Sequence, residues 1–228
     1  ILMNTLQTKI CGIRSHQSAL AAAKGSANYI GFNFVTTSKR LIEANHAKTI
    51  VRDLKNEYPE PDRPKVVGVF ANQPLLYVNS VAEYCDLDMV QLSGDEPFAF
   101  AQLVISPVIK AIKVDTDASK EAELNRLDQL SRLAKKMNLL VILDKYDQYL
   151  QGGTGHIHDW DLAAKLAEHY SFLLSGGLNL ENINEAILSV RPFGVDVASG
   201  IEIDGQDDGT KITEFLRAAQ ASSENVER

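Results

Sequence analysis

The sequence predicts an α/β protein that folds as one closed barrel of eight strand–helix units. Three observations support this fold class. First, short apolar runs alternate with amphipathic helical patterns eight times along the chain. Second, each unit is about 25 to 30 residues long, which is the length of one βα step. Third, the chain has 228 residues, close to the roughly 250 residues typical of a single (β/α)8 barrel.

The predicted strands are short runs of aliphatic and aromatic residues with little polar interruption. Such runs are expected of parallel strands that are covered by helices. A strand with one solvent-exposed face alternates apolar and polar residues instead. In chain order the strands are TKICGI (8–13), YIGFNF (29–34), KVVGVFA (65–71), MVQLSG (89–94), VIKAIKV (108–114), LLVILDK (139–145), FLLSGG (172–177) and GVDVASG (194–200).

An amphipathic pattern follows each predicted strand. The helices are expected at 15–25, 44–58, 74–85, 96–105, 119–136, 159–170, 180–191 and 208–222. In the fifth helix leucine recurs at every third position and charged residues fill the rest of the surface, which predicts one apolar face. These leucines are Leu124, Leu127, Leu130 and Leu133. Side chains suited to N-capping stand at three of the helix starts, namely Ser15, Asn45 and Asp159.

The same local alternation also fits an open, doubly wound sheet, because periodicity does not report whether a sheet closes. The number of units favours the barrel. We therefore expect a ragged N-terminal segment at 1–7, a single barrel domain at 8–222 and a polar C-terminal tail at 223–228. Because the chain begins with Ile1 instead of methionine, we expect a processed chain, a recombinant version or part of a longer polypeptide.

Composition and charge exclude several classes of partner. The formal net charge is −7 and lysine and arginine do not cluster, which argues against a nucleic-acid partner. No apolar run approaches the roughly 20 residues of a membrane-spanning helix, and no secretory signal is recognised. Cys11 and Cys85 lie far apart in sequence, which favours a reducing compartment over a disulfide scaffold. A cytoplasmic protein with no membrane or nucleic-acid partner is expected.

In a (β/α)8 barrel the chemistry lies at the carboxyl ends of the strands and in the loops that follow. Glycines come directly after the last two predicted strands, at Gly176-Gly177 and at Ser199-Gly200. Backbone N–H groups in such loops approach an anion closely, and barrels frequently bind phosphate there. Gly153 and Gly155 add a glycine-rich loop after the sixth strand. The sequence thus predicts a phosphorylated ligand, although each glycine pair alone also fits a tight turn.

Three further polar residues follow strand ends. Cys11 ends the first strand, Arg40 follows the second and Asp144 ends the sixth. A thiol and a carboxylate across a barrel mouth are able to divide base and acid work, and an arginine fork suits a carboxylate. Each residue also has a structural interpretation: a packed small hydrophobe for Cys11, a loop-capping carboxylate for Asp144 and a solvated charge for Arg40.

In their order along the chain, the motifs at the strand ends resemble the phosphoribosylanthranilate isomerase family. The motifs are KICG (9–12), GFNF with SKR (31–40), VGVF (67–70), VQLSGDE (90–96), LD with GGTG and DW (143–160), LSGGL (174–178) and GVDVASG (194–200). Each motif is weak alone, whereas the ordered set covers nearly the whole chain. The NQP at 72–74 is similar to the fungal members. The resemblance implies a TIM-barrel isomerase of tryptophan biosynthesis that uses no cofactor and no metal.

The resemblance also implies a reaction and a role for each site residue. The reaction is an Amadori rearrangement of N-(5-phosphoribosyl)anthranilate to 1-(2-carboxyphenylamino)-1-deoxyribulose 5-phosphate. Cys11 is then the general base, Asp144 the general acid, and Arg40 the partner of the anthranilate carboxylate. The glycine loops are expected to hold the phosphate, and Asp196 to contact the sugar or order the site. Gly12 is expected to leave room for the substrate. The base must be a thiolate, so we expect Arg40 to lower the pKa of Cys11.

Two positions depart from the family pattern. Ser93 stands where the family usually has histidine, and Ala198 where the pattern has serine. Two alternatives therefore stay open: a barrel that binds a phosphosugar without catalysis, and another phosphate-binding barrel enzyme such as an epimerase. A monomer and a domain of a multifunctional protein of the tryptophan pathway both fit. His156 and His158 lack a third metal ligand in a recognisable pattern, and no metal site is predicted.

Overall fold

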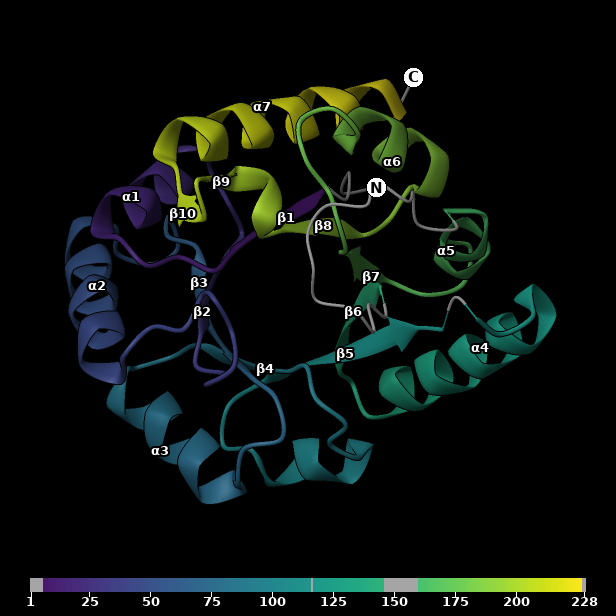
Figure 1. The fold of residues 1–228 in the computed structure, drawn as a ribbon, viewed down its shortest axis with the longest axis horizontal. Helices are drawn as coiled ribbons and strands as arrows, with labels where there is room; N and C mark the ends of the chain where they lie inside the picture. Colours follow the sequence, from purple (N-terminus) through teal and green to yellow (C-terminus); the bar gives the residue numbers. More distant parts are fainter. Residues whose placement is uncertain (1–5, 116, 146–159, 227–228) are drawn as a thin grey trace.

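A computed structural model describes residues 6–115, 117–145 and 160–226 of the chain. The main sheet is a closed parallel barrel in the order β1-β2-β3-β4-β5-β6-β7-β8, and β8 pairs back onto β1. Figure 1 looks into the barrel, with the strands at the centre and a ring of helices around them. The expected (β/α)8 barrel is confirmed, and the open doubly wound sheet is excluded.

The strands are β1 (Gln7–Cys11), β2 (Tyr29–Asn33), β3 (Lys65–Phe70), β4 (Met89–Leu92), β5 (Val108–Val114), β6 (Leu140–Lys145), β7 (Phe172–Leu174) and β8 (Gly194–Val197). The helices are α1 (His16–Lys24), α2 (Ala44–Glu57), α3 (Leu75–Tyr84), α4 (Lys120–Lys136), α5 (Trp160–Ala167), α6 (Ile183–Val190) and α7 (Gly209–Val226), with two 3₁₀ segments, η1 (Phe98–Leu103) and η2 (Ser199–Ile201). A short antiparallel pair, β9 (Glu202–Ile203) and β10 (Gln206–Asp207), lies between η2 and α7.

Alternate residues of each strand fill the inside of the barrel, as the two-residue period of a strand requires. The middle of the interior is apolar, and its buried cluster consists of Val67, Ile109, Ala111, Ile142 and Leu173. Two residues further along β6, and just past the end of β7, the same faces carry Asp144 and Ser175. The interior therefore changes from apolar to polar toward the carboxyl ends of the strands.

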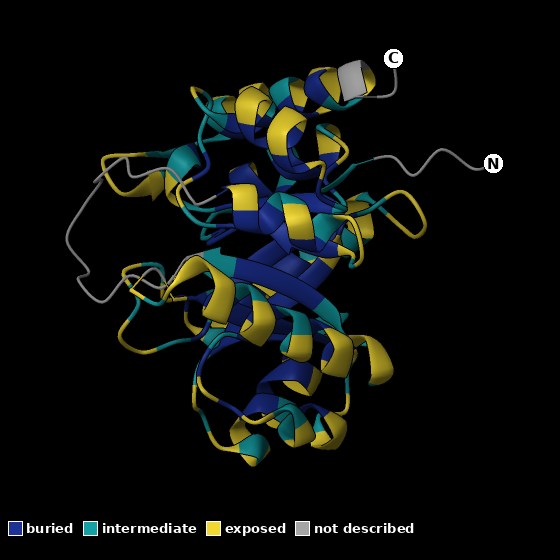
Figure 2. Ribbon diagram, turned by 90° about the vertical axis from the view of Figure 1, so that its right-hand side faces the viewer, coloured by how far each residue is buried: buried dark blue, intermediate teal, exposed yellow. Residues whose placement is uncertain are grey.

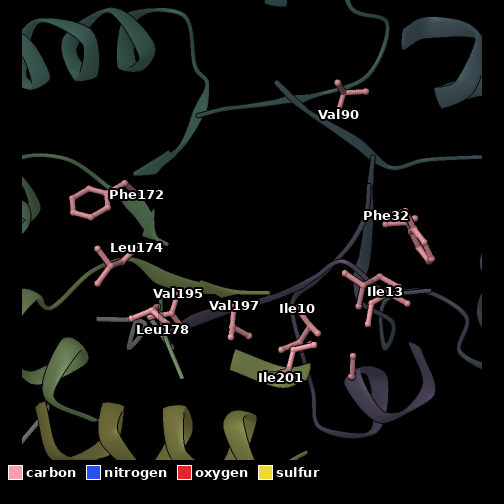
Figure 3. Close-up of a cluster of buried hydrophobic side chains, with 14 of the residues drawn as sticks. Ile10, Ile13, Phe32, Val90, Phe172, Leu174, Leu178, Val195, Val197 and Ile201 are labelled. Carbon is pink, nitrogen blue, oxygen red and sulfur yellow. The ribbon is translucent and has the colours of Figure 1, made fainter. Parts of the chain in front are cut away.

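The opposite face of each strand packs against the ring of helices. Ile10 of β1 and Val195 and Val197 of β8 belong to this larger core. Figure 3 shows them gathered with Leu178 and Ile201 beside the barrel wall. In Figure 2 the buried colour runs through the strands, while the outer sides of the helices are exposed. Because both faces of the strands are buried, their sequences read as unbroken apolar runs.

The helix expected at 96–105 is wrong: this segment forms the short 3₁₀ helix η1. Pro97 precedes the turn and Pro107 follows it. Because proline disfavours the helical conformation of the residue before it, the two prolines confine any helix to the short stretch 97–105. The Asn79 side chain also ends the turn, since it bonds the Leu103 carbonyl at 3.2 Å and the Ile105 N–H at 3.1 Å.

The expected helix caps fare differently. Ser15 is confirmed, because its hydroxyl accepts a hydrogen bond from the Ser18 N–H at 3.1 Å. Asn45 is wrong: α2 begins at Ala44 with Glu43 in the cap position. The Asn45 side chain instead accepts a hydrogen bond from the Tyr84 hydroxyl at 2.6 Å, which ties α2 to α3. Asp159 lies outside the described residues.

Two further details of the helices differ from expectation. Leu133, the last leucine of the three-residue repeat in α4, is 40% exposed, because a spacing of three falls behind the 3.6-residue turn and moves around the helix. Helix α7 continues to Val226, so residues 223–226 are helical and the expected tail boundary at 222 falls inside the last helix. Among the described helices, none has the length and apolar character needed to cross a bilayer.

Candidate active site

The site residues expected from the sequence meet at the carboxyl ends of the strands. Cys11 is the last residue of β1, Asp144 lies near the end of β6 and Asp196 lies on β8. All three occupy inward positions: Ile142 in the inner cluster fixes the face of Asp144, while Ile10 in the outer core places Cys11 on the inner face. Gly153 and Gly155 lie outside the described residues, as does the His156–His158 pair.

Cys11 is buried at the inner wall of the barrel beside Gly31 of β2, its register partner. A methyl group on Gly31 would stand 2.8 Å from the Cys11 Sγ and 3.2 Å from the Lys9 Nζ. The thiol and the ammonium group therefore lie over the same glycine. Gly31 leaves the space in which these two groups meet, which explains a glycine inside a strand.

Lys9 is a functional candidate that the sequence reasoning missed. It is fully buried on β1, and its Nζ lies 2.7 Å from the Asp196 carboxylate on β8. The other oxygen of Asp196 accepts a hydrogen bond from the Ser175 hydroxyl at 2.9 Å. Burial disfavours the ammonium form, but attraction to Asp196 and Cys11 outweighs it and raises the pKa of Lys9. A charged lysine therefore stands beside the thiol, and Asp196 has a defined partner in Lys9.

Burial raises the pKa of the Cys11 thiol, and the effects of Lys9 and Arg40 lower it without reversing the shift. The nearby Asp196 carboxylate also raises it. The expected lowering effect of Arg40 is present, but burial outweighs it and the net shift is upward. The physical reason is that the thiol is enclosed by the barrel wall, where a thiolate loses its hydration.

Arg40, in the loop after β2, binds a carboxylate of the protein itself. Its Nε lies 2.8 Å from one oxygen of Glu202 and its Nη2 lies 2.9 Å from the other. The stem of the arginine crosses Gly12, because a methyl group there would stand 2.5 Å from the Arg40 Cδ. Gly12, with φ +83°, thus makes room for the stem of Arg40. Its expected role of leaving room for a substrate stays a prediction.

The loops after β7 and β8 form the candidate phosphate site. Gly176 and Gly177 have φ of +94° and +76°, a conformation that favours glycine. A methyl group on Gly200 would collide with the Leu178 carbonyl oxygen, so the two loops touch there. Gly177, Ser199 and Gly200 line one cavity of about 270 Å³. The sequence reasoning missed Lys211 of α7, which lines the same cavity and donates to the Glu202 carbonyl at 2.9 Å.

Ser93, at the departure from the family pattern, follows β4. Its hydroxyl accepts a hydrogen bond from the buried Gln91 amide at 2.9 Å, and its N–H bonds the Phe70 carbonyl at 2.8 Å. A short hydroxyl therefore caps the Gln91 side chain inside the barrel.

A buried ion pair supports the neighbouring loops. The Lys110 Nζ of β5 lies 3.2 Å from Glu96 and 3.1 Å from the Gly94 carbonyl. Glu96 in turn accepts the Asn72 N–H at 2.5 Å. Burial lowers the pKa of Lys110 against the opposing effect of Glu96. The pair joins the loops after β3 and β4 to β5.

The described residues contain no group of three or more histidine, cysteine, aspartate or glutamate side chains placed to hold a metal ion. The arrangement instead offers proton-transfer groups, a carboxylate-binding guanidinium and a glycine-rich cavity. These suit an acid–base reaction on a small ligand that carries two anionic ends.

Comparison with known sequences gives a match over nearly the whole chain. The family model described as N-(5'phosphoribosyl)anthranilate (PRA) isomerase matches residues 8–218. The N-(5'-phosphoribosyl)anthranilate isomerase of Dehalococcoides mccartyi is 39% identical over 96% of this chain and 98% of its own length. A multifunctional tryptophan biosynthesis protein of Phycomyces blakesleeanus is 34% identical over 95% of this chain but 33% of its own. The fungal likeness of residues 72–74 gains no support from these values.

Solved structures show the same similarity in three dimensions. The phosphoribosyl anthranilate isomerase from Thermotoga maritima has a TM-score of 0.80 and 34% identity, covering 95% of this chain and 99% of its own. A phosphoribosyl anthranilate isomerase in complex with reduced 1-(o-carboxyphenylamino)-1-deoxyribulose 5-phosphate has a TM-score of 0.76 at 32% identity, with the same coverage. KGPDC from Streptococcus mutans, at 11% identity and a TM-score of 0.61, shares the fold alone.

Proposed function

The chain belongs to the family of N-(5'-phosphoribosyl)anthranilate isomerases, and we propose that it performs the family's Amadori rearrangement with Cys11 as the general base and Asp144 as the general acid. The substrate is N-(5-phosphoribosyl)anthranilate and the product 1-(2-carboxyphenylamino)-1-deoxyribulose 5-phosphate. The observation that carries the proposal is the pair of inward strand-end positions, Cys11 on β1 and Asp144 on β6, at one mouth of one barrel.

The proposed chemistry begins with opening of the ribose ring. Asp144 gives a proton to the ring oxygen while the nitrogen lone pair forms a C=N bond to C1 and the C1–O bond breaks. The Cys11 thiolate then removes the proton from C2. The electron pair of that C–H bond forms the C1=C2 bond of an enolamine, while the π pair of the C=N bond returns to nitrogen. Tautomerisation puts a proton on C1 and takes one from the C2 hydroxyl. C1 is reduced as C2 is oxidised, so the reaction balances without an external redox reagent.

Two anchors would hold the substrate at its ends. Arg40 suits the anthranilate carboxylate, because its guanidinium already binds a carboxylate in a planar, bidentate manner. Gly176, Gly177, Ser199 and Gly200 would bind the phosphate through backbone N–H groups, and the cavity that three of them line supports this role. Anchoring both ends would hold C1 and C2 between the base and the acid.

Lys9 is the group that favours ionisation of Cys11, and Asp196 holds Lys9 in place. Lys9 is the cation whose attraction lowers the pKa of Cys11 most among its neighbours. We therefore assign to Asp196 the ordering of the site through Lys9, one of its two expected roles. Because burial still raises the pKa of the thiol, the thiolate is the minor form of Cys11 at neutral pH, and its share grows as the pH rises.

Both cysteines are free, and we propose the cytoplasm as the compartment, since a thiol base requires reducing conditions. A phosphosugar-binding barrel without catalysis is the second candidate, and the replacements at Ser93 and Ala198 are the observations that favour it.

The test is turnover of freshly made N-(5-phosphoribosyl)anthranilate, followed by the loss of its fluorescence. The wild type should be active, while Cys11→Ala and Asp144→Asn should each lower kcat by about 100-fold or more, with unchanged circular dichroism. A folded wild type that binds the reduced product analogue but shows no turnover supports the second candidate. Full activity in either variant would contradict the proposed residue role.

A further inference from the structure

The guanidinium of Arg40 is engaged at one edge and open at the other. Glu202 takes the edge formed by Nε and Nη2, with N–O distances of 2.8 and 2.9 Å. The guanidinium has a second edge, formed by Nη1 and Nη2, and each of these nitrogens carries an N–H group that points outward from it. No described residue accepts a hydrogen bond from Nη1. One carboxylate is thus bound side-on, and a second can bind end-on in the same plane.

Glu202 is itself held in place from several directions. It begins β9, and its register partner in the short antiparallel pair is Asp207 of β10. Lys211 of α7 donates to its carbonyl at 2.9 Å. The Arg14 Nη2 lies 3.7 Å from its carboxylate, and Arg14 also pairs with Asp207 at 3.4 Å. Figure 1 shows β9 and β10 beside α1 and the start of α7. The carboxylate that orients Arg40 is therefore fixed by the frame of the barrel.

On the basis of the proposed function, we infer that Glu202 is a positioning residue for the substrate carboxylate: it locks Arg40 by the Nε–Nη2 edge and presents the Nη1–Nη2 edge to the anthranilate group. The stem of Arg40 lies on Gly12, immediately after Cys11 in the chain, so the orientation of the guanidinium sets where the aromatic end of the substrate sits relative to the base.

The charge of Glu202 adds selectivity to this orientation. Arg14, Arg40, Glu202 and Asp207 form a cluster of two positive and two negative groups. A single-charged, planar carboxylate fits the open edge in the plane of the guanidinium. A phosphate, with almost twice the charge, would stand close to the Glu202 carboxylate and be repelled. Glu202 therefore disfavours binding of the substrate with its two ends exchanged.

The experiment compares Glu202→Gln with the wild type on two substrates, N-(5-phosphoribosyl)anthranilate and its analogue without the carboxylate, N-(5-phosphoribosyl)aniline. The variant should lose about tenfold in kcat/KM on the first substrate, mainly through KM, and less than twofold on the second. Inorganic phosphate should inhibit the variant more strongly than the wild type. Asp204→Asn, in the turn of the same hairpin, removes the same charge without touching Arg40 and should change neither ratio.

Three outcomes overturn the inference. An equal loss on both substrates would mean a general structural role for Glu202. A lower KM for the carboxylate substrate would mean that Glu202 competes with it for Arg40. An effect of the same size in an Arg40→Lys background would mean that Glu202 acts independently of the guanidinium. The proposed function is tested separately, since it fails if the wild type is inactive or if Arg40→Lys leaves the preference for the carboxylate substrate intact.

Discussion

The chemistry at the carboxyl end of the barrel depends on how a few charged side chains are paired. Cys11 is the residue whose pKa responds to Lys9, Arg40 and Asp196 together. Its thiol is desolvated by the barrel wall, attracted by Lys9 and Arg40 and repelled by Asp196. Lys9 in turn is largely compensated by Asp196, 2.7 Å away. The reactivity of the thiol should therefore respond in opposite directions when either partner of that ion pair is neutralised.

We expect Lys9→Met to raise the pKa of Cys11 and Asp196→Asn to lower it, because the first removes the attracting cation and the second removes the carboxylate that offsets it. The measurement is the rate of iodoacetamide modification against pH in a Cys85→Ala background. This background is chosen because Cys85, whose pKa burial raises to about 11, would otherwise add a slow second reaction. At neutral pH the first variant should react more slowly than the parent and the second faster. Rates that move in the same direction would show that Lys9 and Asp196 do not set the thiol pKa.

A methyl group at Gly31 should damage activity more than stability. It would stand 2.8 Å from the Cys11 Sγ and 3.2 Å from the Lys9 Nζ, so Gly31→Ala should separate the two groups. The expected cost in stability is about 1–3 kcal/mol, measured by denaturant unfolding, with a loss of at least about tenfold in kcat. Gly209→Ala is the matched control, since its methyl group meets Ala21 at an ordinary 3.4 Å. Unchanged kcat in Gly31→Ala would show that activity does not depend on the close packing of Cys11 and Lys9.

At the scale of elements, each end of the barrel has its own ion pair. The carboxyl end carries the buried Lys110–Glu96 pair, whereas Asp88 organises the amino end between β3 and β4. Its carboxylate accepts the Val66 N–H at 2.7 Å and both terminal nitrogens of Arg63 at 2.6 and 2.9 Å. Burial alone would raise the pKa of Asp88, but these donors, together with Lys55, outweigh it and lower the pKa.

This shift predicts part of the acid sensitivity of the protein. A carboxyl with a lowered folded-state pKa stabilises the fold above its unfolded pKa of about 3.9, and the contribution is lost as pH falls through the folded value. Asp88→Asn should therefore lower Tm at pH 7, and the gap to the wild type should shrink as the pH falls from about 5 to 3. Thermal unfolding by circular dichroism gives this gap, with the exposed Asp204→Asn as the control. A gap that stays constant across this range would contradict the assignment.

The elements also show which local patterns are reliable. Unbroken apolar runs predicted β1 to β8, because strands covered on both faces leave that signature. The pattern at 96–105 misled, since Pro97, Pro107 and the Asn79 side chain govern that segment. The prediction of Asn45 as a helix cap was wrong, because its side chain accepts a hydrogen bond from the Tyr84 hydroxyl of another helix. Local propensity is overridden where a side chain has a tertiary partner.

For the whole molecule, the barrel explains how much of the site could be predicted. The positions of Cys11, Arg40 and Asp144 could be predicted, because strand ends can be located in a sequence and the carboxyl ends of all strands lie at one face of a barrel. Their roles and those of the glycine loops stay predictions, tested by the variants above. The side chains that pair with the site residues could not be predicted from the sequence. Glu202 is 162 residues from Arg40 and Asp196 is 187 from Lys9, and no local pattern signals such distant pairs.

The span of the Lys9–Asp196 pair also bears on how the protein is made. β1 and β8 are the first and last strands of the barrel, and their pairing closes it. During synthesis Lys9 emerges first, and its counter-ion emerges only after 187 further positions have been added. Until then Lys9 lacks the carboxylate that pairs with it in the complete barrel, so a partial barrel that closed early would bury the lysine without Asp196. The ion pair that shifts the pKa of the thiol thus also disfavours premature closure, and the proposed base has its full surroundings only when the last strand is in place.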